Sequence, residues 1–370
     1  MLKIITISPY SYPSACGIWR RVYLDAKVLT SKGYNVTSFS SNIIKGTKGI
    51  SPDYDELDGI KIFRFPIKFR LGGTSMFFFF RKKLKEINPD IIHVHGYRHP
   101  HSLQGLILGK LMRKKVILTS HGPFHKDPKR PLIMKLIDIA YDLLIGWWEL
   151  RLYNKIIAIA EWEIPELIKR GANKSKIELI PNSLGKEFET AEISSHAEPL
   201  GKVIYMGRVE SVKRPEKIVE LAKRLPKIKF TIFGPQQGYS FEENLPENLE
   251  LINKSYTPKD FIEQAKENDI FLLPSVRESF GIVGLEAMSQ GLILISTRTR
   301  GVTQYLVDGE NGFLVDSVEE IKSRIEYIYH NWEKMEIIRE KAFDTIVPAY
   351  TEEKLGQKLL ELYNKLESRK

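Results

Sequence analysis

Apolar residues gather in short runs along the chain, and the stretches between these runs carry helical periodicity. Residues 2–8 form one such run, which predicts a buried strand followed by a loop. Residues 22–29 then place apolar side chains among basic ones, and Gly33 stands where a helix C-cap belongs. Residues 34–40 predict a second strand. This strand–helix–strand order predicts the opening of a parallel, doubly wound sheet.

The second half of the chain repeats this order. Residues 202–206 predict a strand and residues 207–214 a loop, and Pro215 suits the first position of the next helix. Residues 228–233 predict the following strand. We therefore expect an α/β protein with two Rossmann-like domains rather than one long sheet.

Domain boundaries follow from length and composition. A chain of 370 residues suits two domains of roughly 100–200 residues each. Residues 184–200 mix Glu, Ser, Ala and Pro without apolar periodicity, which is typical of a linker. We therefore assign residues 1–183 to the first domain and 201–347 to the second. The pattern stays helical after Pro348, so residues 348–370 form a separate terminal helix.

Bulk composition bounds the class of protein. The apolar share of 42% and the charged share of 28% are those of a soluble globular protein. Cys16 is the single cysteine, which excludes an internal disulfide and favours a reducing compartment, and no signal peptide is visible at the N-terminus. The net charge of +10 suits nucleic acid, an anionic membrane surface or anionic nucleotide substrates. No nucleic-acid-binding motif appears, so we do not expect nucleic acid as a partner.

Two apolar stretches bear on membranes. Residues 77–80 are four phenylalanines followed by three basic residues, which suits either a membrane-facing surface or a buried helix, and we favour the buried helix. Residues 132–148 are longer and apolar, but Lys135, Asp138 and Asp142 recur at helical spacing. These charges give the predicted helix a polar face, so we do not expect a transmembrane span.

The most informative stretch is residues 274–291. An apolar run at 269–273 predicts a strand, a loop containing Glu278 follows, and residues 282–289 predict a short helix that carries Glu286. Free N–H groups and the positive dipole end at the start of that helix suit a phosphate. Carboxylates repel phosphate but accept hydrogen bonds from hydroxyl groups. The combination predicts a nucleotide-sugar site.

The paired glutamates lie in Glu278-Ser-Phe-Gly-Ile-Val-Gly-Leu-Glu286-Ala-Met, which resembles the signature of the retaining nucleotide-sugar glycosyltransferases of glycosyltransferase family 4. The resemblance covers nearly the whole chain and is strongest over 200–316. It implies the GT-B fold, in which two Rossmann-like domains face each other across a cleft and a C-terminal helix crosses back onto the first domain. It also implies that the first domain binds acceptor and the second binds the donor.

Further motifs extend the resemblance to the donor site. Residues 207–213 resemble the family's diphosphate loop, and cations there would offset the charge of a departing diphosphate. The resemblance places Glu286 on the ribose and Glu278 on hydroxyls of the transferred sugar, with Gly17 near the phosphates, although Cys16 stands where the family often has another glycine. The predicted donor-binding residues are Gly17, Arg208, Lys213, Ser279, Phe280, Gly281 and Glu286.

Histidines at strand ends suggest the acceptor side. Residues 90–96 predict a strand with His93 and His95 on one face, where zinc is conceivable, but no acidic or thiol partner accompanies them at familiar spacing. His121 ends the strand predicted at 116–122, at the edge where ligands bind in open α/β sheets. The resemblance makes His121 the cleft histidine near the reacting carbon. We therefore predict His121 and Glu278 as catalytic residues and no metal; a structural role for either histidine stays open.

Other positions match less well. Pro181-Asn182 resembles the family's domain-junction motif, with Ser183 in place of the usual glycine, and Asn182 joins His95 as a predicted acceptor-side residue. Arg300 and Gln304 stand where a glycine and a glutamate are common. A non-catalytic sugar- or lipid-binding protein therefore stays open, as does an epimerase or phosphorylase of the same fold. The missing Gly-x-Gly-x-x-Gly fingerprint argues against an NAD-dependent oxidoreductase.

The function we predict is retaining transfer of a hexose from a UDP- or GDP-type sugar to a hydroxyl of a glycan, glycolipid or small molecule. Neither a cofactor nor a metal is required, because cations and helix N–H groups ease departure of the diphosphate. The predicted partners are the nucleotide-sugar and a carbohydrate or lipid-linked acceptor, with an anionic membrane surface as a further hypothesis. We expect a cytoplasmic protein, with peripheral attachment to the membrane as an open alternative.

Overall fold

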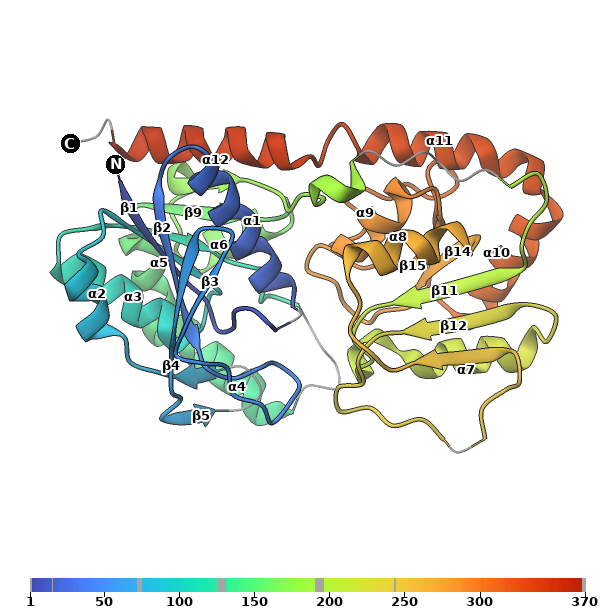
Figure 1. Ribbon diagram of the computed structural model, residues 1–370, viewed down its shortest axis with the longest axis horizontal. Helices are drawn as coiled ribbons and strands as arrows, with labels where there is room; N and C mark the ends of the chain where they lie inside the picture. Colours follow the sequence, from blue (N-terminus) through green and yellow to red (C-terminus); the bar gives the residue numbers. More distant parts are fainter. Residues whose placement is uncertain are drawn as a thin grey trace. The chain divides into compact units, whose positions relative to one another are not determined.

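The computed structural model describes residues 2–14, 16–71, 75–125, 131–189, 196–242 and 244–367. The chain forms two compact units. Unit 1 comprises Met1–Asn182 together with Glu352–Lys370, and unit 2 comprises Ser183–Thr351. Each unit is an α/β layer structure built on a parallel sheet (Figure 1).

The described part of unit 1 contains an eight-stranded sheet in the order β10-β9-β8-β7-β1-β2-β4-β3. Neighbouring strands are parallel, except that the edge strand β3 pairs antiparallel with β4. The strand order reverses between β1 and β7, which makes their carboxyl ends a ligand-binding edge in doubly wound sheets. The strands are β1 Lys3–Ile7, β2 Asn35–Ser41, β3 Tyr54–Leu57, β4 Ile60–Phe65, β7 Ile91–His95, β8 Lys115–Thr119, β9 Lys155–Ala158 and β10 Ile177–Leu179, and a separate hairpin joins β5 Phe69–Leu71 to β6 Ser75–Phe77.

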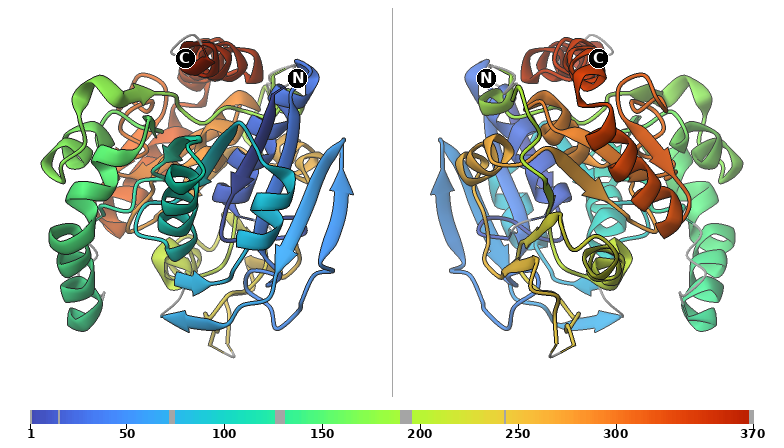
Figure 2. Two further views of the ribbon diagram at one scale, coloured as in Figure 1. Left: turned by 90° about the vertical axis from the view of Figure 1, so that its left-hand side faces the viewer. Right: turned by 90° about the vertical axis from the view of Figure 1, so that its right-hand side faces the viewer.

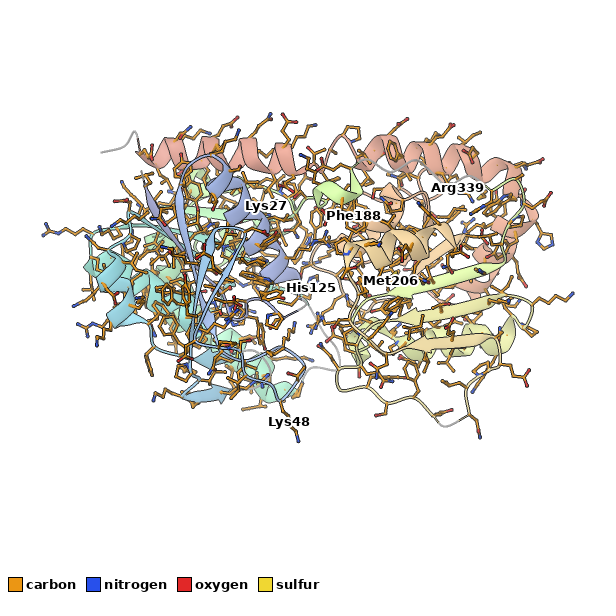
Figure 3. All side chains as sticks on the ribbon, viewed as in Figure 1. Lys27, Lys48, His125, Phe188, Met206 and Arg339 are labelled. Carbon is orange, nitrogen blue, oxygen red and sulfur yellow. The ribbon has the colours of Figure 1, made fainter. Side chains whose placement is uncertain are left out.

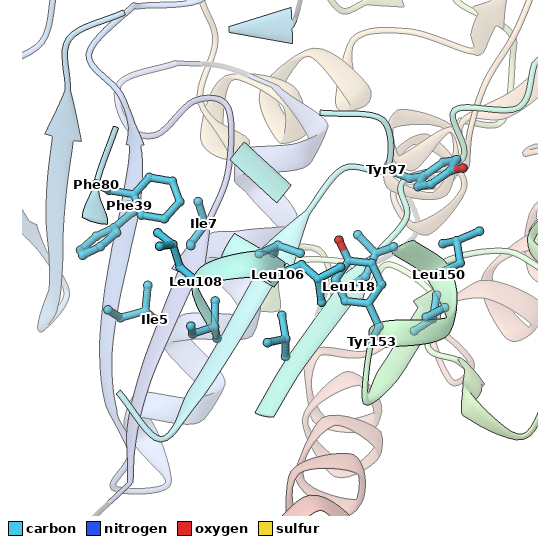
Figure 4. Packing of buried hydrophobic residues seen from close by; sticks show 14 of the residues in the cluster. Ile5, Ile7, Phe39, Phe80, Tyr97, Leu106, Leu108, Leu118, Leu150 and Tyr153 are labelled. Atoms are coloured by element: carbon cyan, nitrogen blue, oxygen red, sulfur yellow. The ribbon is translucent and has the colours of Figure 1, made fainter. Parts of the chain in front are cut away.

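Helices cover both faces of the unit 1 sheet, because its strands bury side chains on alternate faces. On one face Ile5, Ile7 and Ile92 pack under α3 and α5 in a cluster that Figure 4 shows from close by. On the other face Ile4 and Ile91 pack with α1 and α12. The helices of unit 1 are α1 Gly17–Ser31, α2 Arg81–Ile87, α3 Pro100–Leu111, α4 Leu132–Tyr141, the π-helix η1 Asp142–Gly146, α5 Trp147–Leu152, α6 Glu163–Lys169 and α12 Glu352–Glu367.

The C-terminal helix α12 is part of unit 1 and packs on α1. Its Leu355, Leu359 and Tyr363 are buried, and the Tyr363 hydroxyl lies 2.9 Å from Nδ1 of His93 in the sheet. Lys27 of α1, labelled in Figure 3, pairs with Glu352 at 3.3 Å. A buried apolar stripe and a buried hydrogen bond therefore fix this helix to unit 1.

The described part of unit 2 contains a six-stranded, fully parallel sheet in the order β13-β12-β11-β14-β15-β16. In chain order this is the 3-2-1-4-5-6 arrangement of a Rossmann sheet, with its switch point between β11 and β14. The strands are β11 Lys202–Met206, β12 Lys229–Phe233, β13 Leu249–Ile252, β14 Ile270–Leu273, β15 Ile293–Thr297 and β16 Phe313–Val315, and the helices are α7 Pro215–Arg224, α8 Pro258–Lys266, α9 Ile282–Ser289, α10 Val318–His330 and α11 Met335–Ile346.

The segment predicted as a linker, residues 184–200, differs from that prediction where it is described. Leu184 and Phe188, the latter labelled in Figure 3, are buried. The Leu184 amide donates to the Tyr350 carbonyl, and the Phe188 ring meets Phe261 edge-on with centroids 5.6 Å apart. Residues 184–189 are therefore packed on unit 2, while residues 190–195 lie outside the described residues. Two isolated apolar anchors do not produce a periodic pattern, which is why the sequence suggested a linker.

The phenylalanine run does not form the buried helix that we favoured. Residues 75–77 form β6, and residues 78–80 belong to neither a strand nor a helix before α2 begins at Arg81. Phe78 and Phe80 are buried, whereas Phe79 is 62% exposed. Four identical residues have no period of their own, so this pattern could not distinguish a helix from an extended segment.

Candidate active site

Two loops lie together at the switch point of the unit 2 sheet. One follows β11 and contains residues 207–214, and the other follows β14 and contains residues 274–281. The Val276 amide donates to the Val212 carbonyl at 2.8 Å, which joins the loops through their backbones. The order of strands therefore brings the predicted diphosphate loop and the predicted paired-glutamate loop to one edge of the sheet.

A cation and a carboxylate meet across these loops. The Lys213 ammonium lies 2.6 Å from Oε1 of Glu278, and the Ser275 hydroxyl donates to the same oxygen at 2.7 Å. Both charged side chains are largely buried, with relative exposures of 15% and 9%. Solvent therefore screens this ion pair less than one at the surface.

Two buried tyrosines hold the two loops that carry this pair. The Tyr205 hydroxyl donates to the Arg208 carbonyl at 2.8 Å, and the Tyr305 hydroxyl donates to the Gly281 carbonyl at 2.8 Å. The pKa of both tyrosines is raised well above the usual value, mainly by burial and to a smaller extent by the negative charge of Glu278. Both phenols therefore stay protonated and can hold one loop each.

Arg208, the second predicted cation, occupies the same loop but has a local partner. Its guanidinium pairs with Glu210 at 3.2 Å and is partly exposed. Gly207, the residue before it, has a φ of +154°, and a Cβ atom at this position would lie 2.8 Å from the Tyr205 hydroxyl. The backbone conformation and the close contact after β11 therefore favour a glycine at position 207.

The helix α9 begins where it was predicted to begin. Gly281 is its N-cap, with a φ of +83°, and no side chain among the described residues caps this end. Phe280 is buried against Tyr305 and Tyr350, whose ring centroids lie 6.0 and 5.7 Å away, and Glu286 is buried on the helix. Ser279 stands between Glu278 and Phe280 in the same loop. The predicted donor residues 279–281 and 286 thus surround the helix start.

Sequence reasoning missed Gly301, which lies directly against this loop. Its amide donates to the Glu278 carbonyl at 3.1 Å, and a Cβ atom at 301 would stand 2.5 Å from that carbonyl oxygen and 2.6 Å from the Phe280 nitrogen. Only a glycine fits so close an approach of two backbones. The available signal was the Arg300-Gly301 pair in the turn that follows β15.

The predicted histidines of unit 1 also come together. His95 ends β7 and His121 follows β8, and Nδ1 of His95 lies 3.1 Å from Nε2 of His121. Burial, reinforced by nearby cationic and histidine side chains, lowers the pKa of both imidazoles well below the usual value. Both rings are therefore neutral at pH 7. His121 also has a φ of +59°, an uncommon left-handed conformation for a histidine.

A buried glutamate supports the His121 turn and was not predicted. The Ser120 hydroxyl donates to Oε2 of Glu163, which is fully buried at the start of α6. Burial raises the pKa of Glu163 to about 8, against the lowering effect of its hydrogen bonds to Ser120, Ile159 and Gly122. Glu163 therefore holds a proton at neutral pH. Its position in the first turn of a helix after a strand was the only sequence signal.

Asn182, predicted on the acceptor side, has a contact of another kind. Its side-chain oxygen accepts from the buried Arg21 guanidinium at 3.1 Å, which also donates to the carbonyls of Ile180 and Pro181. Arg21 pairs with Asp25 at 2.7 Å. This contact gives the Asn182 side chain a structural role, which does not involve an acceptor substrate.

Gly17, predicted near the donor phosphates, is the first residue of α1. Among the described residues, and apart from its own chain neighbours, no heavy atom lies within 4 Å of a Cβ atom built there. The packing of unit 1 therefore does not require a glycine at this position.

The fold brings an acidic residue, Asp25, close to the histidines, although no acidic residue lies near them in the sequence at a spacing typical of metal sites. Asp25, His93 and His95 each offer one ligand-type atom, and these atoms lie within 4.8 Å of one another. Both ring nitrogens of His93 already have partners, Thr119 at 2.7 Å and Tyr363 at 2.9 Å. The Arg21 guanidinium beside Asp25 also opposes a further cation. This donor set fits a hydrogen-bonded network better than a metal.

Two Rossmann-like units, one of them with a cation, a carboxylate and an open helix start at its switch point, define a nucleotide-sugar-type glycosyltransferase architecture. The family model described as glycosyl transferases group 1 matches residues 187–345, and the model described as glycosyltransferase family 4 matches residues 16–184. The chain belongs to the family 4 glycosyltransferases. The recognition drawn from its paired glutamates is confirmed.

Two sequence relatives match most of this chain. An uncharacterized glycosyltransferase of Methanocaldococcus jannaschii is 25% identical over 407 positions, which cover 99% of each chain. An uncharacterized 41.2 kDa protein in the cps region of Klebsiella pneumoniae is 27% identical over 289 positions, 73% of this chain and 78% of that protein.

Solved structures show the fold. Sucrose-phosphate synthase from Thermosynechococcus elongatus aligns over 100% of both chains with a TM-score of 0.77 at 16% identity. Anabaena HepE in complex with UDP and glucose aligns over 99% of this chain and 100% of that chain, with a TM-score of 0.75 at 16% identity. The predicted GT-B fold is confirmed.

Proposed function

We propose that this protein is a retaining glycosyltransferase that moves a hexosyl group from a nucleoside-diphosphate sugar to a hydroxyl of an acceptor. The observation that carries the proposal is the meeting of Lys213 and Glu278 beside the start of α9, at the switch point of the unit 2 sheet. A cation for phosphate, a carboxylate for hydroxyls and unpaired helix N–H groups are the three features that a nucleotide-sugar requires.

Donor binding rearranges the Lys213–Glu278 pair in this proposal. The diphosphate carries more negative charge than one carboxylate and draws the Lys213 ammonium towards it. Glu278 then loses its cationic partner, and Oε1 becomes available to accept a hydrogen bond from a sugar hydroxyl. Arg208 turns from Glu210 to the same diphosphate, and Glu286 accepts from the ribose. Donor binding thereby places Lys213 on the diphosphate and leaves Glu278 free to bind the sugar.

Transfer itself exchanges one bond at the anomeric carbon. The bond between that carbon and the diphosphate oxygen breaks, and the acceptor oxygen bonds to the carbon on the same face. The acceptor proton passes to the departing phosphate oxygen. Lys213, Arg208 and the start of α9 offset the charge that develops on the leaving group, so the proposal requires no metal.

Unit 1 supplies the acceptor side of the proposal. His121 stays neutral, so its ring can exchange hydrogen bonds with a sugar hydroxyl near the reacting carbon, while His95 orients it through the 3.1 Å contact. The acceptor is a glycan, a glycolipid or a small molecule with a free hydroxyl. UDP-sugars are the first donors to test, because the structurally similar Anabaena HepE was crystallised with UDP and glucose. We propose a cytoplasmic setting, where such donors are made.

A product analysis tests the proposal. The purified protein is incubated with UDP-, GDP- and ADP-hexoses and a panel of hydroxylated acceptors, and nucleoside diphosphate release and the anomeric signal of the product are followed by NMR. Release that depends on acceptor, with the donor's anomeric configuration kept, supports a retaining transferase. Inversion would contradict the retaining mechanism, and tight donor binding without turnover under every acceptor would favour the non-catalytic sugar-binding alternative.

A further inference from the structure

The helical segment 132–152 presents its apolar side outwards. Figure 2 shows the segment that contains α4 projecting from the body of unit 1. No residue of α4 itself is buried. The large apolar side chains on its outer side and on the following turns are between 47% and 72% exposed; they are Leu132, Ile133, Leu136, Ile139, Leu143, Leu144 and Trp147, which we call the α4 stripe. These positions follow helical spacing, so the stripe is a continuous surface.

The carboxylates of the segment lie on the opposite side and bind the protein. Asp142 accepts from the Tyr97 hydroxyl at 2.9 Å and pairs with the Arg98 and Arg170 guanidinium groups. Asp138 lies 3.5 Å from Arg98. Burial alone would raise the pKa of Asp142, but the two arginines and Tyr97 lower it, so its charge is retained.

These contacts fix the rotation of the segment about its axis. A second anchor holds the next turn, where the Tyr141 and Tyr153 hydroxyls donate to the buried Glu149 carboxyl at 2.8 and 2.9 Å. The π-helix η1, which adds a residue to the turn, lies between the two anchors. We predicted a polar face here and expected no membrane span; the polar face exists, but it faces the protein. An ordinary surface helix has the reverse arrangement.

The surroundings of the stripe carry positive charge. The Arg151 guanidinium lies 5.2 Å from the centre of the Trp147 ring. Lys176 donates to the carbonyls of Arg151 and Tyr153, at the end of α5. The carboxylates of the segment, Asp138, Asp142 and Glu149, are all turned to the protein side. The stripe therefore has a basic fringe, formed by Arg151 and Lys176, and none of the carboxylates within residues 132–152 lies on its outer side.

We propose that the α4 stripe is a docking surface for the anionic face of a lipid bilayer. Aliphatic side chains would enter the boundary between headgroups and acyl chains, Trp147 would lie at that boundary, and the basic fringe would contact anionic headgroups. The charge of the whole chain, +10, favours an anionic surface and opposes a second copy of the same chain on this face. This surface replaces the phenylalanine run as the membrane-facing element, since Phe79 alone of that run is exposed there.

The proposed mode is attachment rather than insertion across the bilayer. Among the residues that the structure describes, no helix is long and apolar enough to cross a membrane. An apolar stripe beside a polar, anchored face is the arrangement of a helix that lies in the interface plane. The proposal is independent of the glycosyl transfer proposed above, because it concerns no residue of the donor or acceptor site.

A matched pair of substitutions tests the proposal. Ile139 in the stripe and Ile337 on α11 of unit 2 are both helical isoleucines, 55% and 57% exposed, so Ile139→Glu and Ile337→Glu make the same chemical change at equal exposure. The full chain and both variants are floated with phosphatidylcholine vesicles, with and without a quarter of phosphatidylglycerol, at low and high salt. Circular dichroism establishes that both variants are folded.

We expect the wild type and Ile337→Glu to float with the anionic vesicles. Ile139→Glu should partition at least about tenfold more weakly, because a charge then replaces apolar area that the bilayer would cover. Binding should weaken on neutral vesicles and in high salt. Failure of the wild type to float with anionic vesicles would overturn the proposal, as would equal weakening by both variants. A wild type that does not float but dimerises by light scattering, with Ile139→Glu monomeric, would assign the stripe to a second copy instead.

Discussion

The Lys213 ammonium and the Glu278 carboxylate, 65 positions apart in the chain, lie 2.6 Å from each other at the switch point of the unit 2 sheet. The family resemblance gives these two side chains different ligand groups, a phosphate and a sugar hydroxyl. Without donor they form an ion pair with each other in a largely buried position. The donor must therefore separate them, and substitutions of the two residues should have different consequences.

Lys213→Ala should lower kcat/KM by at least about 10²-fold, because the departing diphosphate loses a charge partner in the transition state. Initial rates with the preferred donor measure this effect. Lys217→Ala is the matched control, since Lys217 lies in the first turn of α7 and its ammonium pairs with Glu220 at 3.1 Å. Near-normal turnover of Lys213→Ala, or an equal loss in Lys217→Ala, would remove Lys213 from the proposed mechanism.

Glu278→Gln should separate binding from transfer. The substitution frees Lys213 of its carboxylate partner, so nucleoside diphosphate affinity should be unchanged or tighter, while kcat falls on the order of 10²-fold through loss of the charged acceptor on the sugar. Calorimetric titration with the diphosphate and initial rates give the two quantities. A collapse of nucleotide affinity in this variant would mean that the assigned roles of the two glutamates are wrong.

Glu163→Gln should change how stability depends on pH. The pKa of Glu163 rises from an ordinary value of 4.5 to about 8 in the folded protein, so the folded state keeps a proton that the unfolded state releases. Stability from this group is complete below pH 4.5 and is lost as the pH rises towards 8. The glutamine side chain of the variant cannot ionise, so it lacks this dependence.

The difference in unfolding free energy between wild type and Glu163→Gln should therefore shift by a few kcal/mol in favour of the variant between about pH 5 and about pH 9. Urea denaturation at several pH values measures it, and all other titrating groups are common to both proteins. A difference that stays constant over this range would show that Glu163 is already ionised at neutral pH.

Tyr363→Phe should weaken the attachment of α12 to unit 1. Removing the hydroxyl leaves Nδ1 of the buried His93 without its partner, at a cost of about 1–3 kcal/mol. Tyr34→Phe is the control, because its hydroxyl lies 3.4 Å from Asn364 at an exposed position. Urea denaturation compares the two variants, and equal stabilities would show that the buried hydrogen bond contributes nothing to docking of the helix.

The sequence predicted those features that repeat or that carry a recognisable pattern. Strand runs and glycines at helix ends were sufficient for the α/β class, and α9 starts at Ile282 as expected because Gly281 can adopt the left-handed conformation before it. Two predicted loops that follow β11 and β14 must meet once the strand order is that of a Rossmann sheet. The proximity of Lys213 and Glu278 is a consequence of that order.

Features that depend on partners from elsewhere in the chain were beyond sequence reasoning. The charges at Asp138 and Asp142 predicted a polar face, but its direction depends on Arg98 and Arg170, which come from other elements. Gly301 is required only because its backbone meets that of Glu278. Such requirements have no local period, and a glycine in a turn does not by itself show which backbone it will meet.

The most direct test of the donor site is nucleotide binding by wild type and Lys213→Ala, measured by thermal shift with UDP, GDP, ADP and NAD in separate samples. A ligand at about 100 times its Kd should add roughly 2.7 kcal/mol of stability. We predict that one nucleoside diphosphate raises the Tm of the wild type and that Lys213→Ala loses most of this shift. A response to NAD alone, or a diphosphate response that Lys213→Ala keeps in full, would contradict the proposed site.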